Sequence, residues 1–250
     1  MINRQKVAMV VAELMGVMVL AMAVYAMVGR TTFPLFAGLA AGTVLGVLVH
    51  TVGSVSGAQV NPAITLGLWS IRKVKTGQAI AYIIAQMLGG LAAWKLAQYF
   101  LGNELQSLAG DKFVWKVLIA EAVGAFVFGF GVASAVYQKY EGTKLAFTVG
   151  ASLTIGILVA SLASNGVLNP AVAVGIQSWS WAYAVGPIVG AAFGMNVYAV
   201  LFTDEISFSR PKAAKSVAVK ATAAKSTAKK KTTSKASAAK KPAKKNTRKR

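Results

Sequence analysis

The chain has 250 residues, 56% of them hydrophobic, with a formal net charge of +20, no cysteine and one histidine. Soluble domains are about 45–50% apolar, so this composition favours a membrane protein. The lack of cysteine excludes disulfides and thiolate metal sites, and a single histidine excludes a histidine metal cluster. His50 lies in an apolar block and is interpreted as a packing or lining residue rather than a catalytic one. No set of nucleophile, base and oxyanion-binding group is visible, so we expect neither an enzyme nor a cofactor or metal site.

Six apolar blocks predict six membrane-spanning helices. A helix needs about 18–20 mostly apolar residues to cross the hydrocarbon core, and the blocks reach or approach this length. In chain order they are residues 7–28, 33–52, 77–101, 113–137, 144–163 and 181–203. The predicted fold class is therefore an all-α membrane protein.

The first block has an alternative interpretation as a secretory signal peptide. It follows two basic residues, and residues 21–23 read Ala-Met-Ala, which resembles a cleavage site. The apolar run nevertheless continues to Val28 and carries Glu13 near its middle. These two features favour a retained transmembrane helix.

The chain contains an internal repeat with an offset of 108 residues. Glu13 and Glu121 occupy matching positions in similar stretches, and an Asn-Pro-Ala triplet that begins at Asn61 recurs at Asn169. Each half, about residues 7–101 and 113–203, holds three apolar blocks. Because three is odd, the second half enters the membrane from the opposite side. The sequence thus predicts an inverted 3+3 repeat with its working site near the midplane, between the halves.

Each Asn-Pro-Ala triplet opens a short apolar segment, residues 62–71 and 170–178. About ten residues are too few to cross a ~30 Å core, so we predict two re-entrant half-helices. Asparagine is a favoured N-cap, and proline suits the first helical position. The alternative is an ordinary N-cap on an ordinary helix, and the recurrence of the triplet at the repeat offset argues against it.

The charged residues between the blocks predict the orientation. One side of the membrane holds most of the Lys and Arg residues, whereas the other holds mainly Arg30 and Lys112. By the positive-inside rule the richer side is cytoplasmic. We therefore expect a multi-pass protein of the plasma or inner membrane with both termini in the cytoplasm. The cytoplasmic basic residues before the tail are Arg4, Lys6, Arg72, Lys73, Lys75, Lys139 and Lys144.

The segment 210–250 differs in composition from residues 1–209. It is rich in Lys, Ala, Ser and Thr and contains no acidic residue, so it is predicted to be a disordered cytoplasmic tail. The main expectation is attraction to anionic lipid, at about 1 kcal/mol per basic residue near the surface. Nucleic-acid binding is the alternative, although no aromatic residue follows Phe208 to stack on bases.

Four stretches resemble the aquaporin (major intrinsic protein) family. Residues 56–65 and 165–171 are similar to its two signature loops, 81–86 to its third helix and 185–190 to the start of its sixth. The resemblance covers about residues 8–203 and omits the tail. It implies a passive channel for water and small neutral solutes, embedded in membrane lipid and usually assembled as a homotetramer with one pore per subunit.

The resemblance also implies a pore centre at the two Asn-Pro-Ala turns. The half-helix N-termini, each with about half a positive charge, would face each other there. Asn61 and Asn169 would donate to a passing oxygen and turn the hydrogens of a water outward, which interrupts a proton wire. The positive helix ends would repel cations, as in aquaporin-type pores generally. The predicted pore-centre residues are Asn61, Pro62, Ala63, Asn169, Pro170 and Ala171.

Two glutamates, Glu13 and Glu121, lie inside predicted spans, where a charge is costly and usually functional or paired. One interpretation is a proton relay. The other, which the family supports, is a buried acceptor that braces the N–H groups of a re-entrant loop. Their symmetric placement favours bracing, and Gln86 is expected to play a similar part.

Aquaporins narrow at four positions on the extracellular side, which fall here on Ala41, Ile157, Gly166 and Val172. Water-selective members usually carry an aromatic residue, His and Arg where this chain has Ala, Ile and Val, and Gln59 replaces a common His. Losing Arg removes a fixed charge and several donors. We expect a wide, apolar constriction that passes glycerol-like polyols, urea-like solutes or dissolved gases as well as water. Alternatively, a nearby side chain or a shifted loop refills the gap.

Two other functions remain open. A secondary active transporter also uses inverted repeats and broken helices, and Glu13 and Glu121 are the candidates for its ion-coupling site. The second alternative is a non-transporting membrane anchor whose basic tail binds polyanions.

Overall fold

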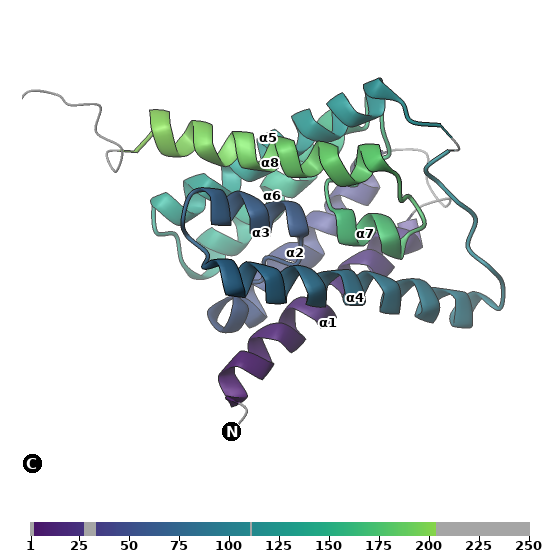
Figure 1. Ribbon diagram of the computed structural model, residues 1–250, viewed down its shortest axis with the longest axis horizontal. Helices are drawn as coiled ribbons and strands as arrows, with labels where there is room; N and C mark the ends of the chain where they lie inside the picture. The colour runs from purple at the N-terminus through teal and green to yellow at the C-terminus, as the bar shows by residue number, and fades with distance from the viewer. Residues whose placement is uncertain (1–2, 28–33, 111, 204–250) are drawn as a thin grey trace, which may run out of the picture. The chain divides into compact units, whose positions relative to one another are not determined.

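The computed structural model describes residues 3–27, 34–110 and 112–203, and all regular elements in these ranges are helices (Figure 1). The tail predicted over residues 210–250 and the basic residue Arg30 lie outside the described residues. Six helices are long and apolar enough to cross a membrane, which confirms the all-α class and the six spans. They are α1 (Arg4–Met27), α2 (Pro34–Ser56), α4 (Thr76–Leu101), α5 (Trp115–Tyr137), α6 (Gly142–Ala160) and α8 (Trp181–Leu201).

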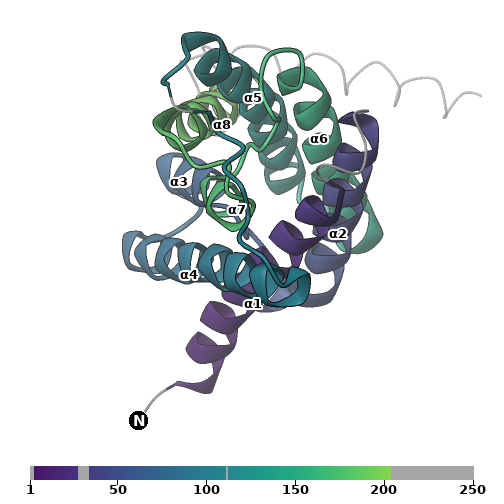
Figure 2. The same ribbon diagram turned by 90° about the vertical axis from the view of Figure 1, so that its right-hand side faces the viewer.

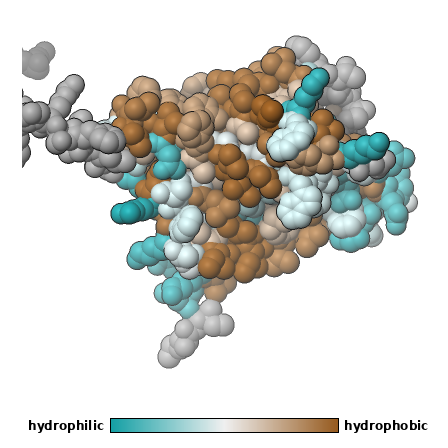
Figure 3. All heavy atoms as spheres, turned by 45° about the horizontal axis from the view of Figure 1, so that its top comes forward, coloured by the Kyte–Doolittle hydropathy of each residue, from teal (hydrophilic) through white to brown (hydrophobic). Residues whose placement is uncertain are grey.

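The outward faces of these helices are apolar. Val47, Ile84 and Phe193 are each more than half exposed, at 56%, 56% and 63%. Figure 3 shows hydrophobic residues across the middle of one face, with hydrophilic residues gathered towards two ends. Apolar surface of this extent is unusual in water and fits a bilayer as the solvent.

Helices α2 and α6 cross at a pair of glycines that the repeat relates. A Cβ atom on Gly42 would overlap the carbonyl oxygen of Gly150, and a Cβ on Gly150 would overlap that of Gly42. Only glycine permits this approach of two backbones, which is a common way for helices to pack in lipid. The flanking contacts exchange under the same 108-residue offset: Gly38 with Thr154, and Gly46 with Ala146. A pseudo-two-fold axis therefore passes between α2 and α6.

The two short helices, α3 (Pro62–Ser70) and α7 (Pro170–Gly175), lie between α4 and α8 (Figures 1 and 2). Each packs extensively against the opposite half of the chain. In α3, Gly67 lies against Met195 of α8, and Gly90 of α4 lies against Ala171 of α7. Neither short helix is held by its own half alone, so the centre of the fold forms only when both halves are packed together.

Candidate functional site

Each short helix begins at an asparagine that caps it. The Oδ1 atom of Asn61 accepts a hydrogen bond from the N–H of Ala63 at 2.8 Å, and that of Asn169 accepts one from the N–H of Ala171 at 3.0 Å. These bonds satisfy first-turn donors that have no partner inside the helix. Proline follows each cap, where its missing N–H costs nothing. The Asn-Pro-Ala triplets therefore define where α3 and α7 begin.

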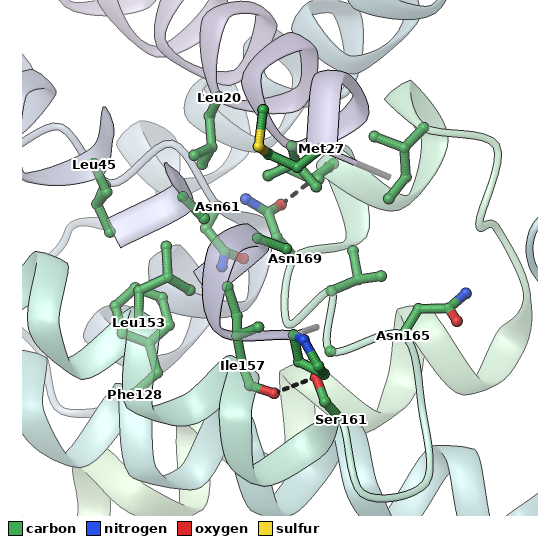
Figure 4. Close-up of a pocket in the computed structure, with 18 of the residues that line it drawn as sticks. Leu20, Met27, Leu45, Asn61, Phe128, Leu153, Ile157, Ser161, Asn165 and Asn169 are labelled. Atoms are coloured by element: carbon green, nitrogen blue, oxygen red, sulfur yellow. Dashed lines mark hydrogen bonds between the residues drawn. The ribbon is translucent and has the colours of Figure 1, made fainter. Parts of the chain in front are cut away.

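The same two side chains join the halves to each other. The Nδ2 atom of Asn61 donates to the carbonyl oxygen of Leu168 at 2.9 Å, and that of Asn169 donates to the carbonyl oxygen of Val60 at 2.8 Å. Both asparagines are 2% exposed, and both line one cavity (Figure 4). A side-chain amide has two N–H groups. One N–H of each asparagine thus has no protein acceptor among the described residues and is available to a solute.

The loop before each half-helix contains backbone in the left-handed region. Val60 and Leu168 have φ angles of 40° and 54°, and Ala58 and Gly166, also related by the repeat, have 45° and 63°. Left-handed backbone is uncommon outside glycine and costs about 1–3 kcal/mol per residue. Turns of this kind direct successive N–H groups to one side, where they form an anion-binding concavity.

A buried carboxylate occupies that concavity in each half. Glu13 accepts hydrogen bonds from the N–H groups of Gln59 at 2.9 Å and Val60 at 2.6 Å. Glu121 accepts them from the N–H groups of Val167 at 2.9 Å and Leu168 at 2.7 Å. Both glutamates are 0% exposed, and neither is among the residues that line the cavity. Their carboxylates therefore face the loop backbone, with the strained residues between them and the cavity.

The first carboxylate has two further donors and the second has one. The Nε2 atom of Gln86 donates to Glu13 at 2.7 Å, as does the Ser56 hydroxyl, also at 2.7 Å. In the second half, the Ser164 hydroxyl donates to Glu121 at 2.8 Å. A buried carboxylate needs several such bonds to offset the loss of its hydration.

The cavity has a volume of about 280 Å³ and reaches from the two asparagines towards the end of α1 and the start of α2. It lies on the side of the molecule away from the first turn of α1. All four positions predicted as a constriction line it and are buried. We call these four residues the outer ring: Ala41, Ile157, Gly166 and Val172.

The cavity wall is largely apolar, and none of the described residues that line it is charged. Several of its polar groups are bonded within the protein. The Ser161 hydroxyl donates to the carbonyl oxygen of Ile157 at 2.7 Å (Figure 4). The Asn165 amide donates to the carbonyl oxygen of Leu108 at 2.9 Å. The side-chain amide donors that remain for a solute belong to Asn61, Asn169 and Gln59.

Sequence reasoning missed several lining residues. Leu45 and Leu153, together with Leu20 and Phe128, are pairs at the 108-residue offset and line the cavity near the asparagines (Figure 4). The sequence could have indicated these pairs, because each consists of two apolar residues 108 positions apart. No such signal existed for Leu108, which reaches the cavity from the loop before α5 because its N–H donates to the carbonyl oxygen of Gln177.

Two polar residues singled out from the sequence lie differently. Gln59 lines the cavity, yet its Oε1 atom is buried and has no hydrogen-bond partner among the described residues. His50 is exposed on α2, in a groove between α2 and α6 that is separate from the cavity.

Comparisons with known proteins agree with this fold. Residues 2–198 match the family model of the major intrinsic proteins. The chain is 29% identical to aquaporin AqpM of Methanothermobacter thermautotrophicus, over 67% of this chain and 76% of that protein. It is 32% identical to nodulin-26 of Glycine max, over 73% and 71%. The X-ray structure of the aquaglyceroporin from Plasmodium falciparum has a similar fold, with a TM-score of 0.65 and 19% identity over 79% of this chain and 97% of that one.

Proposed function

The chain belongs to the major intrinsic protein family, and we propose that its pore passes water together with uncharged solutes of about the size of glycerol or urea. Members of this family are passive channels rather than enzymes. The observation that carries the proposal is the convergence of two half-helix N-termini on one cavity. Asn61 and Asn169 start these helices and each keep an amide N–H for a solute oxygen.

Proton and cation exclusion is proposed for the same point, with Pro62, Ala63, Pro170 and Ala171 completing the pore centre. An oxygen that accepts from both asparagines must turn its own hydrogens away from them. A chain of waters would then be interrupted between the two half-helices. The partial positive charge at each helix start adds a barrier to cations, as in other aquaporin-type pores.

The breadth of the solute range is proposed from the outer ring. Ala41, Gly166 and Val172 contribute small apolar groups or none, and no charged side chain lines the cavity. Val172 directly follows Ala171, at the position where the family usually has arginine, and its side chain offers no hydrogen-bond donor. Leu108 enters the cavity from a neighbouring loop, and it too is apolar. A solute with a hydrocarbon backbone therefore meets compatible walls on the way to the asparagines.

Active transport is the second candidate, and the carboxylates argue against it. A coupling ion must reach its site from the passage. Glu13 and Glu121 are fully buried, point at loop N–H groups and do not line the cavity. This geometry supports a bracing role. The third candidate, a membrane anchor, depends on the tail, which lies outside the described residues.

The setting of the channel is also proposed. The charge distribution supports a plasma or inner membrane location with both termini cytoplasmic. We further propose a homotetramer of channel domains, residues 1–209, in contact with lipid. The basic segment 210–250 would contact anionic lipid headgroups, with nucleic acid as the less favoured partner.

Stopped-flow light scattering on vesicles that contain the purified full chain tests the pore. After a hyperosmotic step with glycerol or urea, the vesicles should shrink quickly and then re-swell, several times faster than protein-free vesicles. A pH-sensitive dye inside the vesicles should report no added proton leak. Fast shrinkage with no re-swelling in either solute would contradict the wide pore. Re-swelling that requires a proton or sodium gradient would favour the transporter.

The tail is examined in the same vesicles. A chain that ends at residue 209 should keep its solute flux if the pore and tail act separately. Sedimentation with anionic and with neutral vesicles, compared between the two chains, then measures what the tail binds.

A further inference from the structure

The cavity at the two asparagines extends from the pseudo-two-fold axis towards one side, although the backbone is repeated on both sides. Leu45 and Leu153 are related by the repeat and both line the cavity, as do Asn61 and Asn169. The axis therefore passes close to the cavity floor. A passage that continues through the molecule must leave the cavity at this floor. It must then run between the residues that lie 108 positions before or after those of the cavity wall.

The repeat identifies the residues on that second side. Subtracting or adding 108 converts Ala41 to Val149, Ile157 to Val49, Gly166 to Ala58 and Val172 to Ile64. None of the four resulting residues is among those that line the cavity. All are buried, at 8%, 6%, 3% and 3% exposure. We call them the mirror ring: Val149, Val49, Ala58 and Ile64.

The equivalence of the two rings is supported by contacts and by backbone conformation. Gly42 and Gly150 contact each other reciprocally, and Ala41 and Val149 directly precede these two glycines, which fixes their register on α2 and α6. Ala58 and Gly166 share a left-handed φ, of 45° and 63°. The positions in both rings are thus related by the same operation that relates the two asparagines.

The side chains of the mirror ring are larger. Alanine becomes valine, glycine becomes alanine and valine becomes isoleucine, while only isoleucine becomes the smaller valine. Further along, Ala37 of the cavity wall corresponds to Leu145. Because the backbone is repeated, added methyl groups must narrow the second side. This agrees with the lining of the cavity at the asparagines, which includes none of the mirror-ring residues.

We propose that the mirror ring, rather than the outer ring, sets the largest solute that crosses this pore. The inference rests on the proposed channel function and assigns its size limit to Val49, Ala58, Ile64 and Val149. Each side chain is aliphatic and offers no hydrogen bond, so a solute must leave water behind to pass. Apolar constrictions of this kind reject solutes by size and by the cost of dehydration. Three-carbon polyols pass most readily, and longer polyols are progressively held back.

Re-swelling of vesicles in glycerol, erythritol and xylitol tests this assignment. Val149→Ala in the mirror ring and Val172→Ala in the outer ring remove the same two methyl groups. We expect Val149→Ala to raise the erythritol rate, relative to glycerol, by about threefold or more, in line with the discrimination that one or two carbons give in an apolar site. Val172→Ala should raise the ratio by clearly less.

Two further variants keep the test decisive. Val123→Ala, on the outward face of α5 where the side chain is 47% exposed, controls for the chemical change and should leave the ratio unchanged. If Val149→Ala does not fold, as judged by gel filtration, Val49→Ala replaces it and is compared with Ile157→Ala.

The outcomes separate the two proposals. If vesicles that contain the unmutated chain show neither water nor glycerol flux above the protein-free level, the channel function itself would be overturned. Normal glycerol flux, with the outer-ring variant widening the solute range as much as the mirror-ring variant or more, would overturn the mirror ring as the size limit and leave the channel intact.

Discussion

The two halves of the molecule support the same loop with different numbers of hydrogen bonds. Glu13 accepts four, from two backbone N–H groups, Ser56 and Gln86. Glu121 accepts three, from two backbone N–H groups and Ser164. The bonds common to both halves are therefore those from the two loop N–H groups and from the serine hydroxyl, and the amide of Gln86 is an addition in the first half.

The reason for the difference lies in α4 and α8, where the repeat offset changes. Gly89 lies against Leu14, and Gly190 lies against Ala122, the repeat partner of Leu14. The offset between these helices is thus 101 residues, and it carries Gln86 onto Pro187. Proline has no amide to donate. The second half keeps the geometry of the loop without the fourth bond.

The comparison teaches which parts of the repeat are constrained. The carboxylate, the serine hydroxyl and the left-handed backbone recur in both halves, since each loop must turn its N–H groups away from the cavity. The donor on the neighbouring long helix differs, so a loop of this type can be held with three bonds. We expect the first half to be the more firmly held.

Removal of either carboxylate should have the largest effect. Glu13→Leu leaves four buried donors without an acceptor, at about 1–3 kcal/mol for each unsatisfied group. Glu121→Leu leaves two, because the Ser164 hydroxyl can still donate to the carbonyl oxygen of Ala160. Both variants should unfold at much lower temperature in detergent and lose solute flux, and Glu13→Leu should be the more severe. Thermal unfolding followed by gel filtration measures the order. If Glu121→Leu proved more severe, the first half would not be the firmer one.

The asparagines should not follow this difference, because each donates one matching bond to the other half. Asn61→Asp and Asn169→Asp keep the capping oxygen but lose the Nδ2 donor to Leu168 or Val60. Each should cost about 1–2 kcal/mol and raise proton or cation leak, since a negative charge now lies at the helix starts. Leak through vesicles loaded with a pH-sensitive dye should be similar for the two variants. A large difference between them would mean that the pore centre is not symmetric.

Loss of the extra amide should make the first half resemble the second. Gln86→Leu removes the fourth donor to Glu13 and also a bond to the Thr65 hydroxyl. We expect a loss of about 1–2 kcal/mol in stability with glycerol flux retained, because three bonds suffice in the other half. Chemical or thermal unfolding measures the loss. Abolished flux in a folded variant would show that Gln86 does more than support the loop.

The smallest effect is expected at Gln59, whose repeat partner is Val167. Its Oε1 atom is buried without a hydrogen-bond partner among the described residues. Gln59→Val removes this unsatisfied acceptor, so stability should stay the same or rise by up to about 1 kcal/mol. Unfolding temperature and glycerol re-swelling are the measurements. A marked drop in glycerol flux would instead make Gln59 a contact of the solute.

Most of the fold followed from the sequence. The six long helices were expected from block length, and the two short ones from caps and from segments too short to cross a membrane. Helix ends shifted by a few residues. Helix α2 runs to Ser56 rather than residue 52, because the Ser56 hydroxyl bonds to Glu13 and its carbonyl oxygen accepts from Tyr82 inside the protein.

By itself the sequence determined the elements, the inverted repeat and the pairs of glutamates and asparagines, since each of these depends on local composition and on a fixed offset. Only the tertiary structure decided which groups meet. Glu13 reaches N–H groups 46 and 47 residues away, and Asn61 reaches a carbonyl 107 residues away. In lipid both the outer and the inner faces of a helix are apolar, so hydrophobic periodicity does not reveal which residues face the passage. Those faces were set by glycine contacts between helices and by hydrogen bonds between the halves.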